Sequence, residues 1–122
     1  MRFLLVSSLV LFGLMLPGRA QDNLFSNARS LVDRVQNDLR HSFRMARDKA
    51  KERERLDNAQ QHLSEFDKDL ARNKFDKDKL NDSINDVKNV VENNTLDPRD
   101  RDGLTQDLQD LRNLRQTRGA GY

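Results

Sequence analysis

One feature limits what this 122-residue chain can fold into: it has no proline and no glycine between Arg19 and Asp97. Proline breaks the interior of a helix and glycine weakens it by about 1 kcal/mol relative to alanine. Apolar residues in this stretch recur at intervals of three and four, which is the helical period, and strand-like alternation is absent. The sequence therefore predicts an all-α protein.

Four apolar stripes predict four helices, over residues 23–47, 49–72, 77–93 and 98–117. The connections between them are short, so neighbouring helices should run antiparallel. We therefore expect a small antiparallel helical bundle of about four helices in residues 21–118, with a flexible tail at residues 119–122. The residues expected to face inward are Leu24, Ala28, Leu31, Val32, Val35, Leu39, Phe43, Ala46, Leu56, Ala59, Leu63, Phe66, Leu70, Leu80, Ile84, Val87, Val91, Leu104, Leu108, Leu111 and Leu114.

The first two stripes do not belong to one continuous helix. At about 100° per residue they lie more than about 100° apart around the axis, so one straight helix could not bury both against the same partner. This geometry predicts a break between Arg47 and Glu52. Asp48 is the expected N-cap of the second helix, because aspartate accepts hydrogen bonds from free amide groups there.

The later helix boundaries have clearer signals. Asp76 precedes the third apolar stripe and is its expected N-cap. The third helix should end within Glu92-Asn93-Asn94, because asparagine tolerates the left-handed conformation of many helix ends. Asp97 and Pro98 match an N-cap followed by the first helical residue of the fourth helix.

Residues 1–20 have the pattern of a cleavable secretory signal peptide. Arg2 is followed by an apolar run over residues 3–16, and Gly18-Arg19-Ala20 offers the small residues of a cleavage site. The run is shorter than the roughly 20 residues that a bilayer core requires. We therefore expect an exported protein, periplasmic or extracellular, with no transmembrane anchor after cleavage.

The charge balance argues against nucleic acid as a partner. Because Arg2 and Arg19 leave with the predicted signal, 20 basic side chains face 20 acidic ones in the remaining chain. A nucleic-acid-binding domain typically has a clear basic excess. The chain also has no cysteine, so helix packing or association with a second copy must supply the stability that disulfides give many small exported domains.

The residues do not form a pattern typical of an enzyme or a metal site. His41 and His62 lie far apart, whereas a zinc site needs at least three converging donors. Residues 97–103 resemble part of a calcium loop, but the carboxylates of its first and last positions are missing. No serine has a partnered histidine, no glycine-rich phosphate loop is present, and no carboxylate lies in an apolar run that would raise its pKa. We expect no catalytic residue, no cofactor and no metal.

Charge is segregated along the chain. Residues 29–55 contain nine basic and five acidic side chains, whereas residues 57–102 contain eight basic and twelve acidic ones. Arg40, Arg44 and Arg47 would lie within about 60° of one another on a continuous helix, away from its apolar stripe. They are the candidate anion-binding residues. The alternative interpretation is an ordinary solvated helix face or charge complementarity within the molecule.

Three motifs stand out: residues 62–67, residues 75–77, and residues 94–102 with their continuation through Leu111-Arg112. In these motifs, residues 55–115 resemble small exported helical proteins of bacteria that carry no assigned function. The resemblance implies a location in the cell envelope and brings no catalytic motif. The chain also shares its size and helicity with periplasmic chaperones of the Spy type, but Leu108 stands where their Leu-Thr-x-x-Gln signature requires glutamine.

Together these features predict a non-enzymatic, exported helical module of the cell envelope that acts in protein interaction, as a chaperone-like protein or as a structural component. Its partner would be another protein, or a second copy of the chain. The alternative is a binder of anionic lipid or polysaccharide surfaces through Arg40, Arg44 and Arg47.

Overall fold

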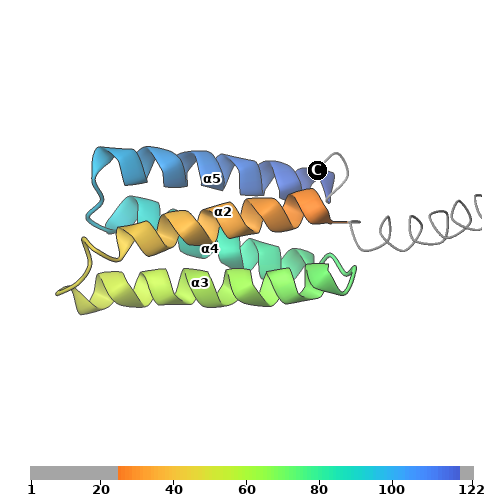
Figure 1. Cartoon of the computed structure of the whole chain (residues 1–122), viewed down its shortest axis with the longest axis horizontal. Helices are drawn as coiled ribbons and strands as arrows, with labels where there is room; N and C mark the ends of the chain where they lie inside the picture. Colours follow the sequence, from red (N-terminus) through yellow and green to blue (C-terminus); the bar gives the residue numbers. More distant parts are fainter. Residues whose placement is uncertain (1–24, 119–122) are drawn as a thin grey trace, which may run out of the picture.

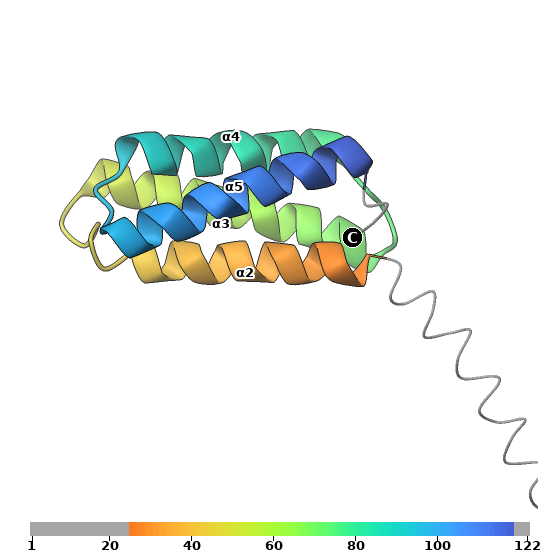
Figure 2. The same ribbon diagram turned by 90° about the horizontal axis from the view of Figure 1, so that it is seen from above.

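The computed structural model describes residues 25–118, which form four helices: α2 (Ser26–Ser42), α3 (Ala50–Ala71), α4 (Lys77–Asn93) and α5 (Pro98–Thr117). No strand occurs in this range. The helices lie side by side, and each runs opposite to the next (Figures 1 and 2). The predicted all-α antiparallel bundle is confirmed.

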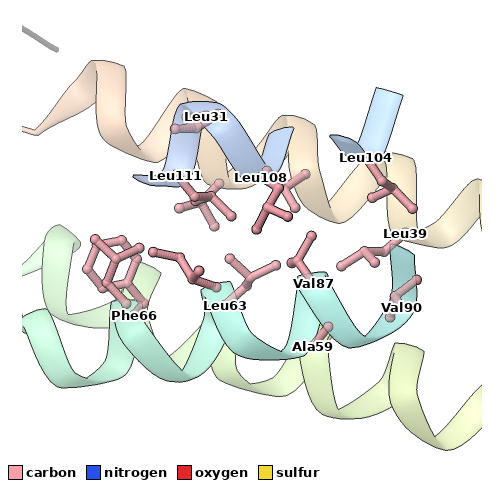
Figure 3. Close-up of a cluster of buried hydrophobic side chains, with 14 of the residues drawn as sticks. Leu31, Leu39, Ala59, Leu63, Phe66, Val87, Val90, Leu104, Leu108 and Leu111 are labelled. Atoms are coloured by element: carbon pink, nitrogen blue, oxygen red, sulfur yellow. The ribbon is translucent and has the colours of Figure 1, made fainter. Parts of the chain in front are cut away.

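The core lies along the axis of the bundle. α2 packs against α3 and α5, and α4 packs against the same two helices, so each helix covers part of the others' apolar faces. Figure 3 shows leucine, valine and phenylalanine side chains from different helices meeting at the centre. The predicted inward face is confirmed for most residues. Phe43 and Val91 are only partly buried, and Val90 is fully buried in place of Val91. Leu24 lies outside the described residues.

The first helix is shorter than predicted. α2 ends at Ser42 instead of residue 47, and the break covers residues 43–49 instead of lying between Arg47 and Glu52. A series of tight turns follows, in which the amides of Met45 and Ala46 bond to carbonyls three residues earlier. These turns fold Ala46 under the end of the core, where it is 1% exposed. Burial at this point outweighs the helical preference of the local sequence.

The helix caps test the local predictions directly. Asp76 and Asp97 are N-caps whose side chains accept hydrogen bonds from the third residue after each of them, as predicted. Asp48 is not the N-cap of α3: Lys49 occupies that position with an extended backbone and no side-chain bond. Asn94 has an extended conformation (φ −90°, ψ 151°) instead of the left-handed one that its residue type permits.

Asn94 is extended because its side chain connects two parts of the chain. Its side-chain nitrogen donates to the carbonyl of Glu52 at 3.0 Å, and its oxygen accepts from Arg55 at 3.1 Å. The Glu52 carboxylate in turn accepts from the backbone amide of Thr95 at 2.9 Å and from its hydroxyl at 3.1 Å. The α4–α5 connection is thereby fixed to the first turn of α3.

Asp69 has a similar role at the other end of the bundle. Its side chain is 1% exposed and accepts from Arg72 at 2.8 Å and from Lys79 at 2.9 Å. These hydrogen bonds to Lys79 and Arg72 hold the pKa of Asp69 below its ordinary value. Asn73 takes a left-handed conformation (φ 60°), which turns the chain from α3 towards α4. The α3–α4 turn therefore closes around a buried carboxylate.

The predicted signal peptide (residues 1–20) and the predicted tail (residues 119–122) lie outside the described residues. Among the described helices, none is long and apolar enough to cross a membrane.

Replacing Asn94 by alanine should lower the free energy of unfolding by about 1–3 kcal/mol, because the carbonyl of Glu52 and the guanidinium of Arg55 lose their buried partner. Chemical denaturation measures this effect. Asn85→Ala is the matched control, since Asn85 is exposed on the neighbouring helix α4. Equal stability of the two variants would contradict the structural role of Asn94.

Candidate functional site

The structure separates the three candidate arginines. Arg40 lies in the last turn of α2, whereas Arg44 and Arg47 lie in the connection at residues 43–49. They therefore do not form a row on one helix face, because α2 ends before the second arginine. All three side chains are exposed at the same end of the bundle.

Arg44 nevertheless brings the three together around two shallow hollows. One, of about 310 Å³, is lined by Arg40, Arg44 and neighbouring side chains of α2. The other, also of about 310 Å³, is lined by Phe43, Arg44, Arg47 and Arg53. Arg53 belongs to α3, and its guanidinium donates to the backbone carbonyl of Arg47 at 3.2 Å, which ties the connection to that helix.

A third and larger hollow, of about 540 Å³, lies between α2 and the start of α5 and has mixed charge. Arg44 and Arg99 line it, together with acidic side chains that include Asp38 and Asp100. The hollow adds a cation from α5 to the cluster. We name this cluster the arginine end and define it as Arg40, Arg44, Arg47, Arg53 and Arg99.

The arginines of the arginine end differ from other arginines of the bundle because they form no ion pair with a carboxylate within residues 25–118. Arg29 forms an ion pair with Asp67 at 3.0 Å, and Arg34 forms one with Asp107 at 3.0 Å. Within residues 25–118, no arginine of the arginine end makes such a pair with a carboxylate. Their guanidinium groups therefore retain donors for an external anion.

The same connection exposes an apolar side chain. Among residues 25–118, the large apolar residue that remains exposed is Met45, with 40% of its surface accessible. It is flanked by Arg44, and Phe43 beside it is only partly buried against the core. The connection thus presents apolar and cationic groups together.

The two histidines lie on different helices, His41 on α2 and His62 on α3. Within residues 25–118, no three His, Cys, Asp or Glu side chains are arranged so that they could hold a metal ion. His62 pairs with Asp86 across the α3–α4 interface, and this hydrogen bond raises the pKa of His62 above its ordinary value. His41 is exposed next to the arginine end. Residues 97–103, compared above with a calcium loop, form the capped start of α5.

Asp107 is a buried carboxyl group that the sequence pattern did not lead us to expect. Its side chain is 2% exposed, and Oδ1 accepts from Arg34 Nε at 3.0 Å while Oδ2 is buried without a hydrogen-bond donor. Burial raises the pKa of Asp107 to about 7. The Asp38 carboxylate also favours the protonated form, by its negative charge and because protonated Asp107 can donate a hydrogen bond to it, whereas Arg34 opposes the shift. The expectation that no carboxylate has a raised pKa was therefore wrong.

The sequence does contain a signal for this burial. Asp107 comes three residues after Leu104 and four before Leu111, so it lies within the apolar stripe of α5. What the spacing does not show is that Asp38 of α2 lies opposite. Asp38 also lies over Gly103, where an added Cβ would meet Asp38 Oδ2 at 3.6 Å.

Comparison with protein families, curated proteins and solved structures finds no match to this chain. The resemblance of residues 55–115 to small exported helical proteins therefore remains an expectation from the sequence. The motif at residues 94–102 has a structural explanation, because Asn94 and Thr95 bind α3 and Asp97 caps α5.

Asp107 makes stability depend on pH. Because its pKa is raised in the folded state, its contribution to stability is complete below pH 3.8 and is lost as the pH rises through about 7. In that window each pH unit lowers the free energy of unfolding by about 1.4 kcal/mol. Asp107→Asn, which stays neutral and can still accept from Arg34, should remove this slope. Denaturation at several pH values measures it, and the same slope in both proteins would show that Asp107 does not titrate near pH 7.

Proposed function

We propose that this protein is an exported, non-enzymatic binding module of the cell envelope that engages anionic lipid or polysaccharide surfaces through the arginine end. The observation that carries the proposal is the cluster of guanidinium groups at one end of the bundle without carboxylate partners among residues 25–118. Asp38, Asp97 and Asp100 line the mixed-charge hollow beside Arg44 and Arg99, but none of them forms an ion pair with these arginines within residues 25–118.

Guanidinium groups suit this ligand chemistry. The planar group donates two parallel hydrogen bonds to a phosphate, sulfate or carboxylate, and it is less strongly hydrated than an ammonium group. Near an anionic membrane surface each cation contributes about 1 kcal/mol to binding. A cluster of several arginines on one surface therefore supports useful affinity without a deep pocket.

A protein partner is the second candidate, and Met45 is the observation that favours it. Its exposed side chain lies next to the half-buried Phe43, and flexible methionine side chains adapt to varied apolar partners. In this case the module would act in protein interaction or as a chaperone-like or structural component. The core of the described bundle is otherwise closed, so the apolar contact would be limited to this connection.

Replacing Arg40, Arg44 and Arg47 together by alanine should weaken binding to phosphatidylglycerol-rich vesicles or to an anionic polysaccharide by about a hundredfold at low salt, since about 3 kcal/mol of attraction is lost. Co-sedimentation with each probe measures the change. The matched control replaces Lys68, Lys74 and Lys88, three exposed lysines outside the arginine end, by alanine. Equal binding by the arginine variant and the natural sequence would contradict the proposal.

The salt dependence separates the two candidates. Charge attraction to an exposed surface should fall steeply as salt rises, because the screening length is only about 8 Å at physiological ionic strength. In affinity capture from an envelope fraction, lipid or polysaccharide should therefore be lost in a high-salt wash. A protein that is retained through that wash, and that Met45→Ala releases, would favour the protein-interaction alternative.

A further inference from the structure

A second cationic hollow lies at the opposite end of the bundle from the arginine end. Its volume is about 560 Å³, and it is formed by the first residue of α4 and the C-terminal half of α5. Figure 1 shows that this end of α5 is remote from the connection at residues 43–49. Its described lining includes Lys77, Arg112, Arg115 and Arg118, and no carboxylate among residues 25–118 lines it. We name it the α5 hollow.

The four cations are not neutralised by the bundle. Within residues 25–118, none of them forms an ion pair with a carboxylate. Arg115 instead donates to the side-chain oxygen of Asn81 at 3.0 Å, which fixes its guanidinium against α4 while leaving other N–H groups unused. The α5 hollow therefore holds several like charges close together, an arrangement that an anion would relieve.

Other cations at this end show that carboxylates are within reach of the chain. Arg29 pairs with Asp67, and both Arg72 and Lys79 pair with Asp69. The fold thus satisfies these three cations and leaves those of the α5 hollow open. This selective pairing distinguishes the hollow from an average charged surface.

Side-chain amides complete the lining. Gln109, Asn113 and Gln116 follow one another at intervals of four and three on α5, so they lie along one face over a length of about 10 Å. Each amide offers both donors and an acceptor, which is what a sugar hydroxyl requires. The α5 hollow places cationic side chains beside amide side chains. It therefore suits a ligand that has both anionic groups and hydroxyl groups.

We propose that the α5 hollow is a binding site for an anionic saccharide, in which the cations bind its sulfate, phosphate or carboxylate groups and the amides bind its hydroxyl groups. A lipid bilayer fits this surface less well, because none of the described side chains that line the hollow is apolar. The arginine end, where Met45 is exposed, differs in this respect. The two sites share no residue, so the proposal stands or fails independently of the proposed function.

Sucrose octasulfate, a small saccharide of high negative charge, is the probe for the test, and sucrose is the uncharged control. Backbone amide NMR of the purified protein locates the ligand residue by residue. The expected result is a saturable shift of signals from residues 109–118 with sucrose octasulfate and none with sucrose. Replacing Lys77, Arg112 and Arg118 together by alanine should weaken this binding at least about tenfold. The Lys68, Lys74 and Lys88 triple variant should leave it unchanged.

A second variant tests recognition of the sugar itself. Asn113→Ala with Gln116→Ala keeps every charge, and alanine favours the helix. It should weaken the binding of a heparin-derived tetrasaccharide, which keeps free hydroxyl groups beside its sulfates and carboxylates, roughly fivefold. Sucrose octasulfate, which has no free hydroxyl group, should bind this variant nearly as well as it binds the natural sequence.

Three results would overturn the proposal: no shift at residues 109–118, equal loss of affinity in the lysine control, or an amide variant with unaltered affinity for the hydroxyl-bearing tetrasaccharide. Preferential contact of residues 109–118 with phosphatidylglycerol vesicles would instead identify a membrane-facing surface.

Discussion

Burial of one apolar face of each helix against the other three is the interaction on which the rest of this molecule depends. No disulfide is available, and each fully buried leucine contributes about 1.5–3 kcal/mol, so the shared core must supply most of the stability. α2 and α4 both pack against α3 and α5, which closes the core from all sides. Each helix is held because its neighbours are in place, and the loops follow from this arrangement.

Buried polar residues then fix the ends of the bundle. Asn94 and Glu52 attach the α4–α5 connection to α3, while Asp69 gathers Arg72 and Lys79 around the α3–α4 turn. Because these contacts pair some of the charged and amide side chains within the bundle, they also determine which cations remain free to bind an external anion. The arginine end and the α5 hollow consist of cations that none of these contacts neutralises.

Asp107 shows that packing of the core also changes the pKa of a side chain. A carboxyl group within an apolar stripe is covered by the packing of α2 on α5, and Arg34 compensates its charge only in part. The consequence is a carboxyl group that changes protonation near neutral pH within a helix interface.

The sequence by itself determined the helical class, the bounds of α4 and α5, the caps Asp76 and Asp97 and nearly all of the core. These features depend on residues three or four positions apart, and such spacing can be read along the chain. Only the tertiary structure decided that α2 ends at Ser42, that Asn94 is extended, that Asp38 faces Asp107 and which arginines lack a carboxylate. Each of these depends on the distance between side chains that are remote in the sequence, and packing of the four helices sets that distance.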